Sequence, residues 1–471
     1  MVMGQSMHTT EVLVIGAGPG GYVAAIRAAQ LGYSVTLVDK KDELGGMCLH
    51  HGCIPSKSLI HAMDLFYQAS NADELGISFG DARIDYVKTQ AWKQSVIDQL
   101  AGGIQTLLSK HEITYFSASA SFQNDKQVVL HGEDLEVNGV EFRYCIVATG
   151  SSPRELPWAP FGGNVLSSKE LLELQEVPRR LVVVGGGYIG VELGVMMRKA
   201  GSEVVLIEGS SKILGVVDDE LSSVAASRVE ELGISLHVDA KVKQVEDRGE
   251  EVFVKAGDEE FVAEKVLVAI GHVPHTQGLQ LELAGVEVNE RGFIVVDEEC
   301  RTSQKHIFAV GDVTGGMMLA HKASAQGRVA AEVIAGLPAA FDPQAIPAVV
   351  FSDPEIATVG LTEAEARERY DDVKVGVFPF SALGRAIAIR KTNGFMKLVA
   401  DSEGVLLGVH GVGPGVNDYI SEMSLALEMG ASAEDLSLII HPHPTLSESL
   451  SEAAEVLLGK AIHIYQPKKQ Q

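Results

Sequence analysis

The order of apolar and glycine-rich segments is the clearest feature of the N-terminal sequence. An apolar run at residues 12–15 leads directly into GAGPGG at 16–21, and a helical apolar periodicity follows over 22–31. A second apolar run at 34–38 then ends on Asp39. We therefore predict a strand, a tight turn, a helix and a second strand, the order found at the start of a Rossmann-like unit.

The same order recurs further along the chain. The apolar run at 181–184 precedes GGGYIG at 185–190, a helix is predicted as far as Lys199, and the run at 203–207 ends on Glu208. In both copies the acidic residue lies 18 positions after the last glycine of the motif. One G-x-G-x-x-G motif is a weak signal, but two copies in this context predict two dinucleotide sites, because glycines let the backbone approach a pyrophosphate at a helix N-terminus. The predicted contacts are Gly16, Gly18, Gly21 and Asp39 in the first copy and Gly185, Gly187, Gly190 and Glu208 in the second.

Further apolar runs outline the rest of the fold. Runs at 146–150 and 266–271 predict strands that each close a dinucleotide domain. The run at 307–312 predicts a buried strand whose final Asp312 either holds a polyol hydroxyl or simply ends the strand. Beyond residue 347 the pattern predicts short strands within 347–361 and 394–412 and amphipathic helices over 418–429 and 446–458.

These patterns predict an α/β fold with two Rossmann-like dinucleotide-binding domains and an α+β C-terminal dimerisation domain. The first dinucleotide domain is expected at 1–149, with a second part at 276–346. The other dinucleotide domain is expected at 150–275, and the C-terminal domain at 347–471.

Composition and charge narrow the class of protein. The 471 residues suffice for about three domains, and 46% hydrophobic residues exclude a disordered chain. The net charge of −25 disfavours nucleic acid and anionic lipid, and it either favours basic protein partners or serves solubility. The first Lys or Arg is Arg27 and the longest uncharged apolar stretch is 12–26, so we expect a cytoplasmic chain with no signal peptide and no membrane helix.

Two of the four cysteines, Cys48 and Cys53, lie five positions apart. In a reducing compartment such a pair is catalytic or metal-binding. Residues five apart in a straight helix are separated by about 7.5 Å along the axis, so we expect an irregular segment, which Gly52 and Pro55 also favour.

A zinc or copper site is the competing interpretation, because His50 and His51 lie between the two cysteines. Four ligands within six residues can hardly surround one ion, so we predict no metal. The other two cysteines, Cys145 and Cys300, lie in strand-like contexts and are expected to be inert.

Several motifs together carry a family resemblance. They are GGMCLHHGCIPSK at 45–57, the two glycine motifs, the ATG and GD strand ends, and HPHPTLSE at 441–448. Over about residues 10–461 the chain resembles the flavin-dependent pyridine nucleotide-disulfide oxidoreductases. It is most similar to the members that oxidise dihydrolipoyl groups.

The resemblance implies a homodimeric enzyme with FAD and NAD as cofactors. It would oxidise a protein-bound dihydrolipoyl group and pass two electrons through Cys48, Cys53 and the flavin to NAD⁺. The implied partners are lipoyl domains and the dihydrolipoyl acyltransferase core of 2-oxo-acid dehydrogenase or glycine cleavage complexes. The alternatives are another disulfide or mercuric-type reductase, and a docking component whose acidic surface holds it on such a core.

The resemblance also assigns roles to residues. Cys48 would exchange with the substrate dithiol, Cys53 would lie against the flavin, and Lys57 and Glu192 would form an ion pair near it. His443 would be the base and Glu448 its orienting carboxylate, contributed across the dimer interface. The first motif with Asp39 would hold the ADP half of FAD, and Asp312 its ribitol region. The other implied cofactor-binding residues are Lys57, Thr149, Gly150, Met318, Leu319, Ala320, Tyr188 and Gly271.

The base role also follows from chemistry, since a dithiol must lose a proton before it attacks a disulfide and histidine titrates near the working pH. Outside its motif His443 would be a surface histidine, and we interpret His441 as structural.

Tyr188 either covers the flavin or packs within the fold. Glu208 would accept bonds from the adenosine ribose and repel a 2′-phosphate, so NAD is preferred over NADP.

Some positions depart from the family pattern. Met47 replaces the usual Thr, and His50 and His51 replace Asn and Val, so two titratable rings flank the redox pair. A cationic ring there would favour the thiolate, unless both rings point to solvent. The segment 271–275 lacks the basic residues that are common after this strand.

Overall fold

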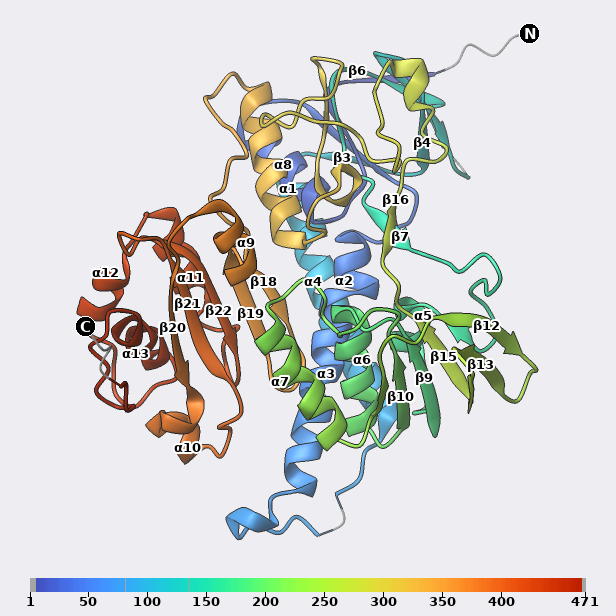
Figure 1. Ribbon diagram of the computed structural model, residues 1–471. Coiled ribbons are helices and arrows are strands. Elements are labelled where there is room, and N and C mark those ends of the chain that lie inside the picture. Colours follow the sequence, from blue (N-terminus) through green and yellow to red (C-terminus); the bar gives the residue numbers. More distant parts are fainter. Residues whose placement is uncertain (1–5, 81, 134, 468–471) are drawn as a thin grey trace. The chain divides into compact units, whose positions relative to one another are not determined.

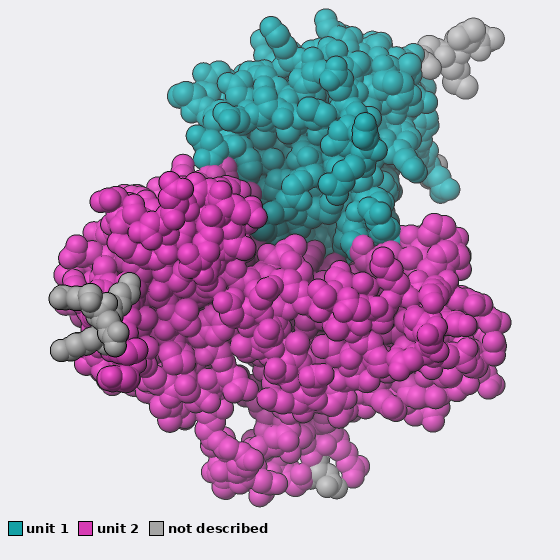
Figure 2. Space-filling view, viewed as in Figure 1, with its two compact units in different colours: residues 1–59, 85–154, 271–342 teal, residues 60–84, 155–270, 343–471 magenta. Residues whose placement is uncertain are grey.

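The computed structural model describes residues 6–80, 82–133 and 135–467. The chain divides into two compact units (Figure 2), each assembled from separate stretches of sequence. Unit 1 comprises residues 1–59, 85–154 and 271–342, and unit 2 comprises residues 60–84, 155–270 and 343–471.

Unit 1 is built on a mixed sheet in the order β3-β2-β1-β6-β5-β4, with β17 also paired to β6. Its strands are β1 Met7–Ile15, β2 Val35–Asp39, β3 Thr114–Ser117, β4 Ser119–Asn124, β5 Gln127–His131, β6 Gly139–Val147 and β17 Ile307–Ala309, and a separate pair joins β7 Ser151–Pro153 to β16 His272–Pro274. The first predicted strand is confirmed but begins earlier, because the residues before the apolar run pair in parallel with β6.

The helices of unit 1 include α1 Pro19–Gln30, α2 Gly46–His51, α4 Tyr86–Lys110 and α8 Ala320–Ile334, with short 3₁₀ turns η2 Leu281–Ala284 and η3 Gly311–Thr314. Helix α3 Cys53–Ser70 begins in this unit and ends in unit 2. Helices α1 and α8 lie side by side (Figure 1), so closely that a Cβ on Gly327 would lie 2.4 Å from the carbonyl oxygen of Gly20.

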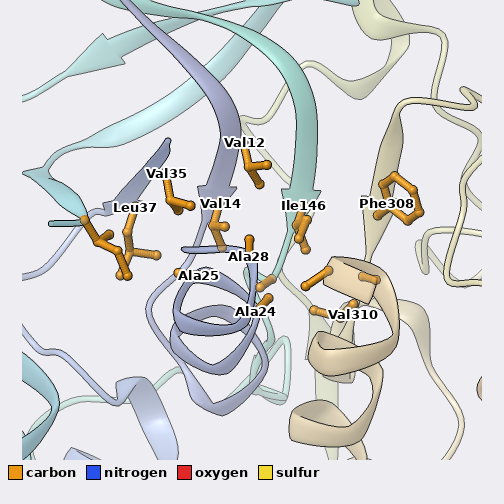
Figure 3. Packing of buried hydrophobic residues seen from close by; sticks show 14 of the residues in the cluster. Val12, Val14, Ala24, Ala25, Ala28, Val35, Leu37, Ile146, Phe308 and Val310 are labelled. Carbon is orange, nitrogen blue, oxygen red and sulfur yellow. The ribbon is translucent and has the colours of Figure 1, made fainter. Parts of the chain in front are cut away.

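A core of small and branched side chains joins α1 and α8 to the sheet (Figure 3). Strand β1 contributes Val12 and Val14, helix α1 contributes alanines such as Ala24, and strand β17 contributes Phe308. Alanines on α1 let the helix approach the sheet closely, because their side chains occupy little space. This packing fixes the turn between β1 and α1, where the first glycine motif lies.

Unit 2 contains a parallel sheet in the order β11-β10-β9-β15-β8. Its elements are β8 Val165–Leu166, α5 Ser168–Glu173, β9 Arg180–Val184, α6 Tyr188–Lys199, β10 Glu203–Ile207, α7 Asp219–Glu231, β11 Ser235–His237 and β15 Lys265–Val268. The second predicted strand–turn–helix–strand is confirmed, and α6 and β10 end where the sequence places them. An antiparallel meander is formed by β12 Val242–Asp247, β13 Val252–Ala256 and β14 Glu259–Ala263.

The C-terminal part of unit 2 is an antiparallel sheet in the order β18-β19-β22-β21-β20. Its strands are β18 Ala348–Val350, β19 Ile356–Gly360, β20 Lys374–Pro379, β21 Phe395–Ala400 and β22 Leu406–Val412. Its helices are α9 Glu363–Arg369, α10 Gly384–Ala388, α11 Ile420–Glu428, α12 Ala433–Leu438 and α13 Glu448–Leu457, and unit 2 also contains the 3₁₀ turns η1 Asp73–Leu75 and η4 Phe380–Ala382. The predicted α/β class with an α+β C-terminal part is confirmed.

The cysteine segment is irregular at Gly52, as predicted, with φ −134° and ψ −103°, but the residues on either side are helical, in α2 and again in α3. The strand-like context predicted for Cys300 is wrong. Cys300 is not in a strand but at the end of a turn with φ +61°, where its N–H donates to the Asp297 carbonyl. Within the described part of the chain, no helix is long and apolar enough to cross a membrane.

Candidate active site

The first glycine motif forms the turn between β1 and α1 in unit 1. Gly16 has φ +106°, and a Cβ on Gly21 would lie 1.8 Å from the Gly16 carbonyl oxygen, so both positions require glycine for the chain itself. A Cβ on Gly18, which caps the N-terminus of α1, would meet nothing within 4 Å. The space beside Gly18 is therefore open to a ligand, as a phosphate-binding turn requires.

The acidic residue of this unit is held against the same turn. One Asp39 carboxylate oxygen accepts the Ala17 N–H at 2.7 Å, and the other accepts the Lys41 N–H at 3.0 Å. Asp39 therefore lies beside the motif with a fixed orientation, where it can accept ribose hydroxyls.

The second motif repeats this geometry in unit 2. Gly185 has φ +109°, a Cβ on Gly190 would lie 1.9 Å from its carbonyl oxygen, and a Cβ on Gly187 would meet nothing within 4 Å. Glu208 accepts the Gly186 N–H at 2.6 Å and the Ser210 N–H at 2.7 Å. Like the first turn, the second has a glycine with positive φ, a close glycine–carbonyl approach, open space at the helix N-cap and a carboxylate held by backbone N–H groups. Both turns therefore fit the ADP half of a dinucleotide.

The cysteine segment packs directly on the first motif. The Gly45 N–H donates to the Ala17 carbonyl at 2.9 Å, and a Cβ on Gly46 would lie 2.7 Å from the Gly18 Cα. Helix α2 then carries Cys48, and α3 begins at Cys53. The structure therefore packs the start of the segment that carries both cysteines against the turn that fits a dinucleotide.

Cys48 and Cys53 are thiols in this structure, and they are close enough to share a hydrogen bond. That hydrogen bond raises the pKa of Cys48 most strongly, burial raises it further, and the charge of Lys57 lowers it. Burial also raises the pKa of Tyr22 on α1, and a charge on Cys48 would raise it further. Lys57 thus opposes the burial penalty on a Cys48 thiolate.

The two histidines between the cysteines are tied to the preceding loop. His51 is 8% exposed and its Nε2 lies 2.9 Å from a Glu43 carboxylate oxygen. The His50 Nε2 lies 2.9 Å from the Leu44 carbonyl oxygen, to which it can donate. Both rings therefore contact the preceding loop and do not simply point to solvent. The effect of a positive charge on either ring on the cysteine thiolates stays a prediction. Across the described residues, no group of three or more His, Cys, Asp or Glu side chains is arranged to hold a metal ion.

The predicted strand ends meet in unit 1. Thr149 donates its hydroxyl to the His275 carbonyl at 2.8 Å, and Ser151 donates to an Asp312 carboxylate oxygen at 2.7 Å. Asp312 lies in the 3₁₀ turn after β17, and Gly150 and Gly271 have φ of +72° and +104°.

The segment 271–275 contains no Lys or Arg, but a lysine from another part of unit 1 lies beside it. The Lys40 Nζ lies 3.0 Å from the His275 Nε2. Burial lowers the pKa of Lys40, and it also lowers the pKa of His275. The structure places Leu319 at the N-cap of α8 and Ala320 at its first residue, directly after Met318.

The histidine–glutamate pair lies at the start of α13 in unit 2. The His443 Nδ1 lies 2.8 Å from one Glu448 carboxylate oxygen, and the other accepts the Thr445 N–H at 2.7 Å. The His443 side chain is 76% exposed, while the Glu448 side chain is 19% exposed. An Nδ1–H donated to Glu448 leaves Nε2 as an exposed base, as proton abstraction requires.

His441 is held differently, two residues earlier. Its side chain is 5% exposed, its Nε2 lies 2.9 Å from a Glu422 carboxylate oxygen, and its Nδ1 lies 3.1 Å from the Ile439 carbonyl oxygen. Bonding to Glu422 raises the pKa of His441. The structural interpretation of His441 fits this buried position.

The remaining predicted residues lie in separate units. Lys57 is in unit 1 and Glu192 in unit 2, so their pairing stays a prediction. Glu192 accepts the Phe351 N–H at 2.8 Å. Tyr188 begins α6 and is 42% exposed, which excludes a role as a core-packing residue of unit 2.

Sequence reasoning missed Tyr22, Glu43 and Lys40, all near the cysteine segment or the first motif. Tyr22 follows the motif directly, in the first turn of α1, and this position could have been singled out from the sequence. Glu43 and Lys40 gave no signal, because only the loop conformation brings them to His51 and His275.

Known protein families match most of this chain. Residues 10–327 match the model of the pyridine nucleotide-disulphide oxidoreductases, and residues 346–454 match the dimerisation domain of the same group. The chain belongs to the pyridine nucleotide-disulphide oxidoreductase family. Residues 346–454 therefore form a dimerisation domain, which supports a homodimer.

Individual relatives cover nearly the whole chain. Dihydrolipoyl dehydrogenase of Geobacillus stearothermophilus is 47% identical over 470 residues, which cover 98% of this chain and 99% of the relative. The Halobacterium salinarum dihydrolipoyl dehydrogenase is also 47% identical, over 472 residues, 98% of this chain and 99% of the relative. Among solved structures, LpdA from Mycobacterium tuberculosis has a TM-score of 0.88 at 28% identity and covers 94% of this chain and 99% of its own.

Proposed function

We propose that this protein acts as a dihydrolipoyl dehydrogenase, an oxidoreductase that forms lipoyl groups from dihydrolipoyl groups and reduces NAD⁺. Two relatives with this activity in their names match it at 47% identity over 98% of the chain. The observation that carries the proposal is the packing of the Cys48 segment against the first glycine motif, through the Gly45 N–H and the close approach of Gly46 to Gly18.

We assign FAD to the first motif and NAD to the second, and the domains to 1–149 with 276–346, 150–275 and 347–471. Bound FAD would accept two electrons from a thiolate and deliver hydride to nicotinamide. The residues that would hold FAD are the first motif with Asp39, the strand-end residues Thr149, Gly150 and Asp312, and Met318, Leu319 and Ala320. Gly185, Gly187, Tyr188, Gly190, Glu208 and Gly271 would serve NAD.

The chain's own groups would handle the protons and sulfur atoms. The Nε2 of His443 would take the proton of a substrate thiol, and the resulting thiolate would attack Cys48 of an oxidised Cys48–Cys53 pair. The S–S bond would break, with Cys53 leaving as a thiolate. The second substrate thiol would then displace Cys48 and close the lipoyl disulfide.

Glu448 would hold the tautomer of His443 and stabilise the imidazolium. The family's dimer would supply His443 from the partner subunit, and lipoyl domains on an acyltransferase core would deliver the substrate. The cytoplasmic location stays a prediction.

The test is NADH formation by the purified FAD-loaded protein from NAD⁺ and dihydrolipoamide, with Cys48→Ser as the inactive reference. Because Glu208 would repel a 2′-phosphate and lose ribose bonds, NADP⁺ should be used on the order of a hundredfold less efficiently. No turnover with dihydrolipoamide would overturn the activity, and equal use of both nucleotides would overturn the role of Glu208.

A further inference from the structure

The segment before β19 contacts helix α6 at two points in unit 2, once through a hydrogen bond and once through an ion pair. The Phe351 N–H donates to a Glu192 carboxylate oxygen at 2.8 Å. Two residues later, an Asp353 carboxylate oxygen lies 2.8 Å from the Lys199 Nζ. Glu192 and Lys199 are seven positions apart on α6, which places them on one face of the helix, about 10 Å apart along its axis.

The second contact belongs to a network of charges around a buried ammonium group. The Lys199 side chain is 5% exposed, and its ammonium contacts Asp353 and also Asp64 of α3, at 2.6 Å. It also lies 5.5 Å from the centre of the Tyr67 ring. Arg228 of α7 reaches the same Asp353 oxygen at 3.2 Å. A buried ammonium is costly without such partners, so the network resists rearrangement.

Asp353 stays ionised within this network. Burial alone would raise the pKa of Asp353, but Lys199 and Arg228 outweigh it and lower the pKa below its ordinary value. The same contact with Asp353 raises the pKa of Arg228 against the opposing effect of burial. A permanent anion at position 353 therefore links α6 and α7 to the segment that carries the Phe351 N–H.

We propose that Asp353 is a positioning residue for Glu192, because its ion pairs with Lys199 and Arg228 hold the Phe351 N–H against the Glu192 carboxylate. The consequence for catalysis rests on the proposed function and on the pairing of Glu192 with Lys57 near the flavin that the family resemblance implies. Without the Asp353 charge, the segment is released from Lys199 and the Glu192 carboxylate loses a fixed donor.

The experiment compares Asp353→Asn with Asp64→Asn in the FAD-loaded protein. Both variants remove one carboxylate from Lys199, but only Asp353 belongs to the segment that bonds Glu192. Amide hydrogen exchange at Phe351 should become at least about tenfold faster in Asp353→Asn and stay near the parent rate in Asp64→Asn, because a hydrogen bond to a charged group is lost only in the first. Lys199→Arg keeps the charge and should keep the protection, whereas Lys199→Gln should lose it, which gives a second route should Asp353→Asn fold poorly.

Unchanged protection of Phe351 in both Asp353→Asn and Lys199→Gln would overturn the proposal, as would equal losses in Asp353→Asn and Asp64→Asn. A second readout is the visible spectrum of the two-electron-reduced protein. Asp353→Asn should change it in the same direction as Glu192→Gln. Lost protection in Asp353→Asn with an unaltered spectrum in Glu192→Gln supports the coupling and contradicts instead the flavin role assigned to Glu192.

Discussion

At the scale of single residues, the exposed ring of His443 and its bond to Glu448 are the features that the proposed chemistry needs. His443→Gln should leave the fold and FAD intact, yet slow dihydrolipoamide oxidation by about 10²–10⁴-fold, the usual contribution of a positioned base. Stopped-flow reduction of the protein by dihydrolipoamide measures this step.

The matched control is His441→Gln, two residues away in the same loop. His441 is buried against Glu422, so this change should reduce stability more than it reduces the rate of thiol oxidation. Oxidation of NADH by ferricyanide needs no thiol deprotonation and should persist in His443→Gln. A His443→Gln protein that oxidises dihydrolipoamide as fast as the parent would remove the histidine from the mechanism.

At the scale of elements, the glycines of one motif differ in what requires them. A Cβ on Gly190 would collide with the Gly185 carbonyl, whereas a Cβ on Gly187 would enter open space. Gly190→Ala should therefore lower the unfolding temperature, while Gly187→Ala should fold normally and bind NADH at least about tenfold more weakly, because its methyl group occupies the path of the pyrophosphate.

Thermal unfolding and NADH titration of both variants separate the two effects. Gly18→Ala and Gly21→Ala form the corresponding pair for FAD in unit 1. Parent-like NADH affinity in Gly187→Ala would contradict the assignment of the second motif.

Helices and strands could be predicted where a regular apolar period is bounded by residues that typically end such an element. Helix α6 and strand β10 follow from an apolar period bounded by glycines and Glu208. Helix α2 was missed because GMCLHH has no long apolar period and is flanked by glycines, which normally argue against a helix. Its first turn is instead stabilised by packing on the first motif, a tertiary effect that overrides local propensity.

The same limit applied to the site. The two candidate redox cysteines, both acidic candidates for ribose binding and the His443–Glu448 pair could be found because their motifs are local in sequence. The partners Glu43, Lys40 and Phe351 could not, because loop conformation or a distant part of the chain brings them to His51, His275 and Glu192.

At the scale of the whole molecule, one buried carboxyl links pH to stability. Burial raises the pKa of Glu355 to about 7, and the charge of Asp418 adds to the rise. The Glu355 Oε2 has no hydrogen-bond partner among the described residues. Because the folded pKa lies above the ordinary carboxyl value, the stability contribution of protonated Glu355 is complete below about pH 4.5 and is lost as the pH rises through about 7.

Glu355→Gln should therefore raise the free energy of unfolding at pH 8, by at most about 3 kcal/mol, and have little effect near pH 4.5. Denaturant unfolding at fixed protein concentration in both buffers measures this, since a dimer's stability depends on concentration. Exposed Glu290→Gln is the control and should show no such difference. An equal change at both pH values would indicate that packing, not ionisation, explains the effect.

The central claim is that Cys48, Cys53 and a flavin held by the first glycine motif form one redox unit. It is tested most directly by the visible spectrum of the purified protein before and after anaerobic addition of dihydrolipoamide. The account predicts a flavin spectrum that gains a long-wavelength thiolate-to-flavin absorption band upon reduction, and loss of that band in Cys53→Ser. A flavin that dihydrolipoamide leaves unreduced, or a band that persists in Cys53→Ser, would contradict it.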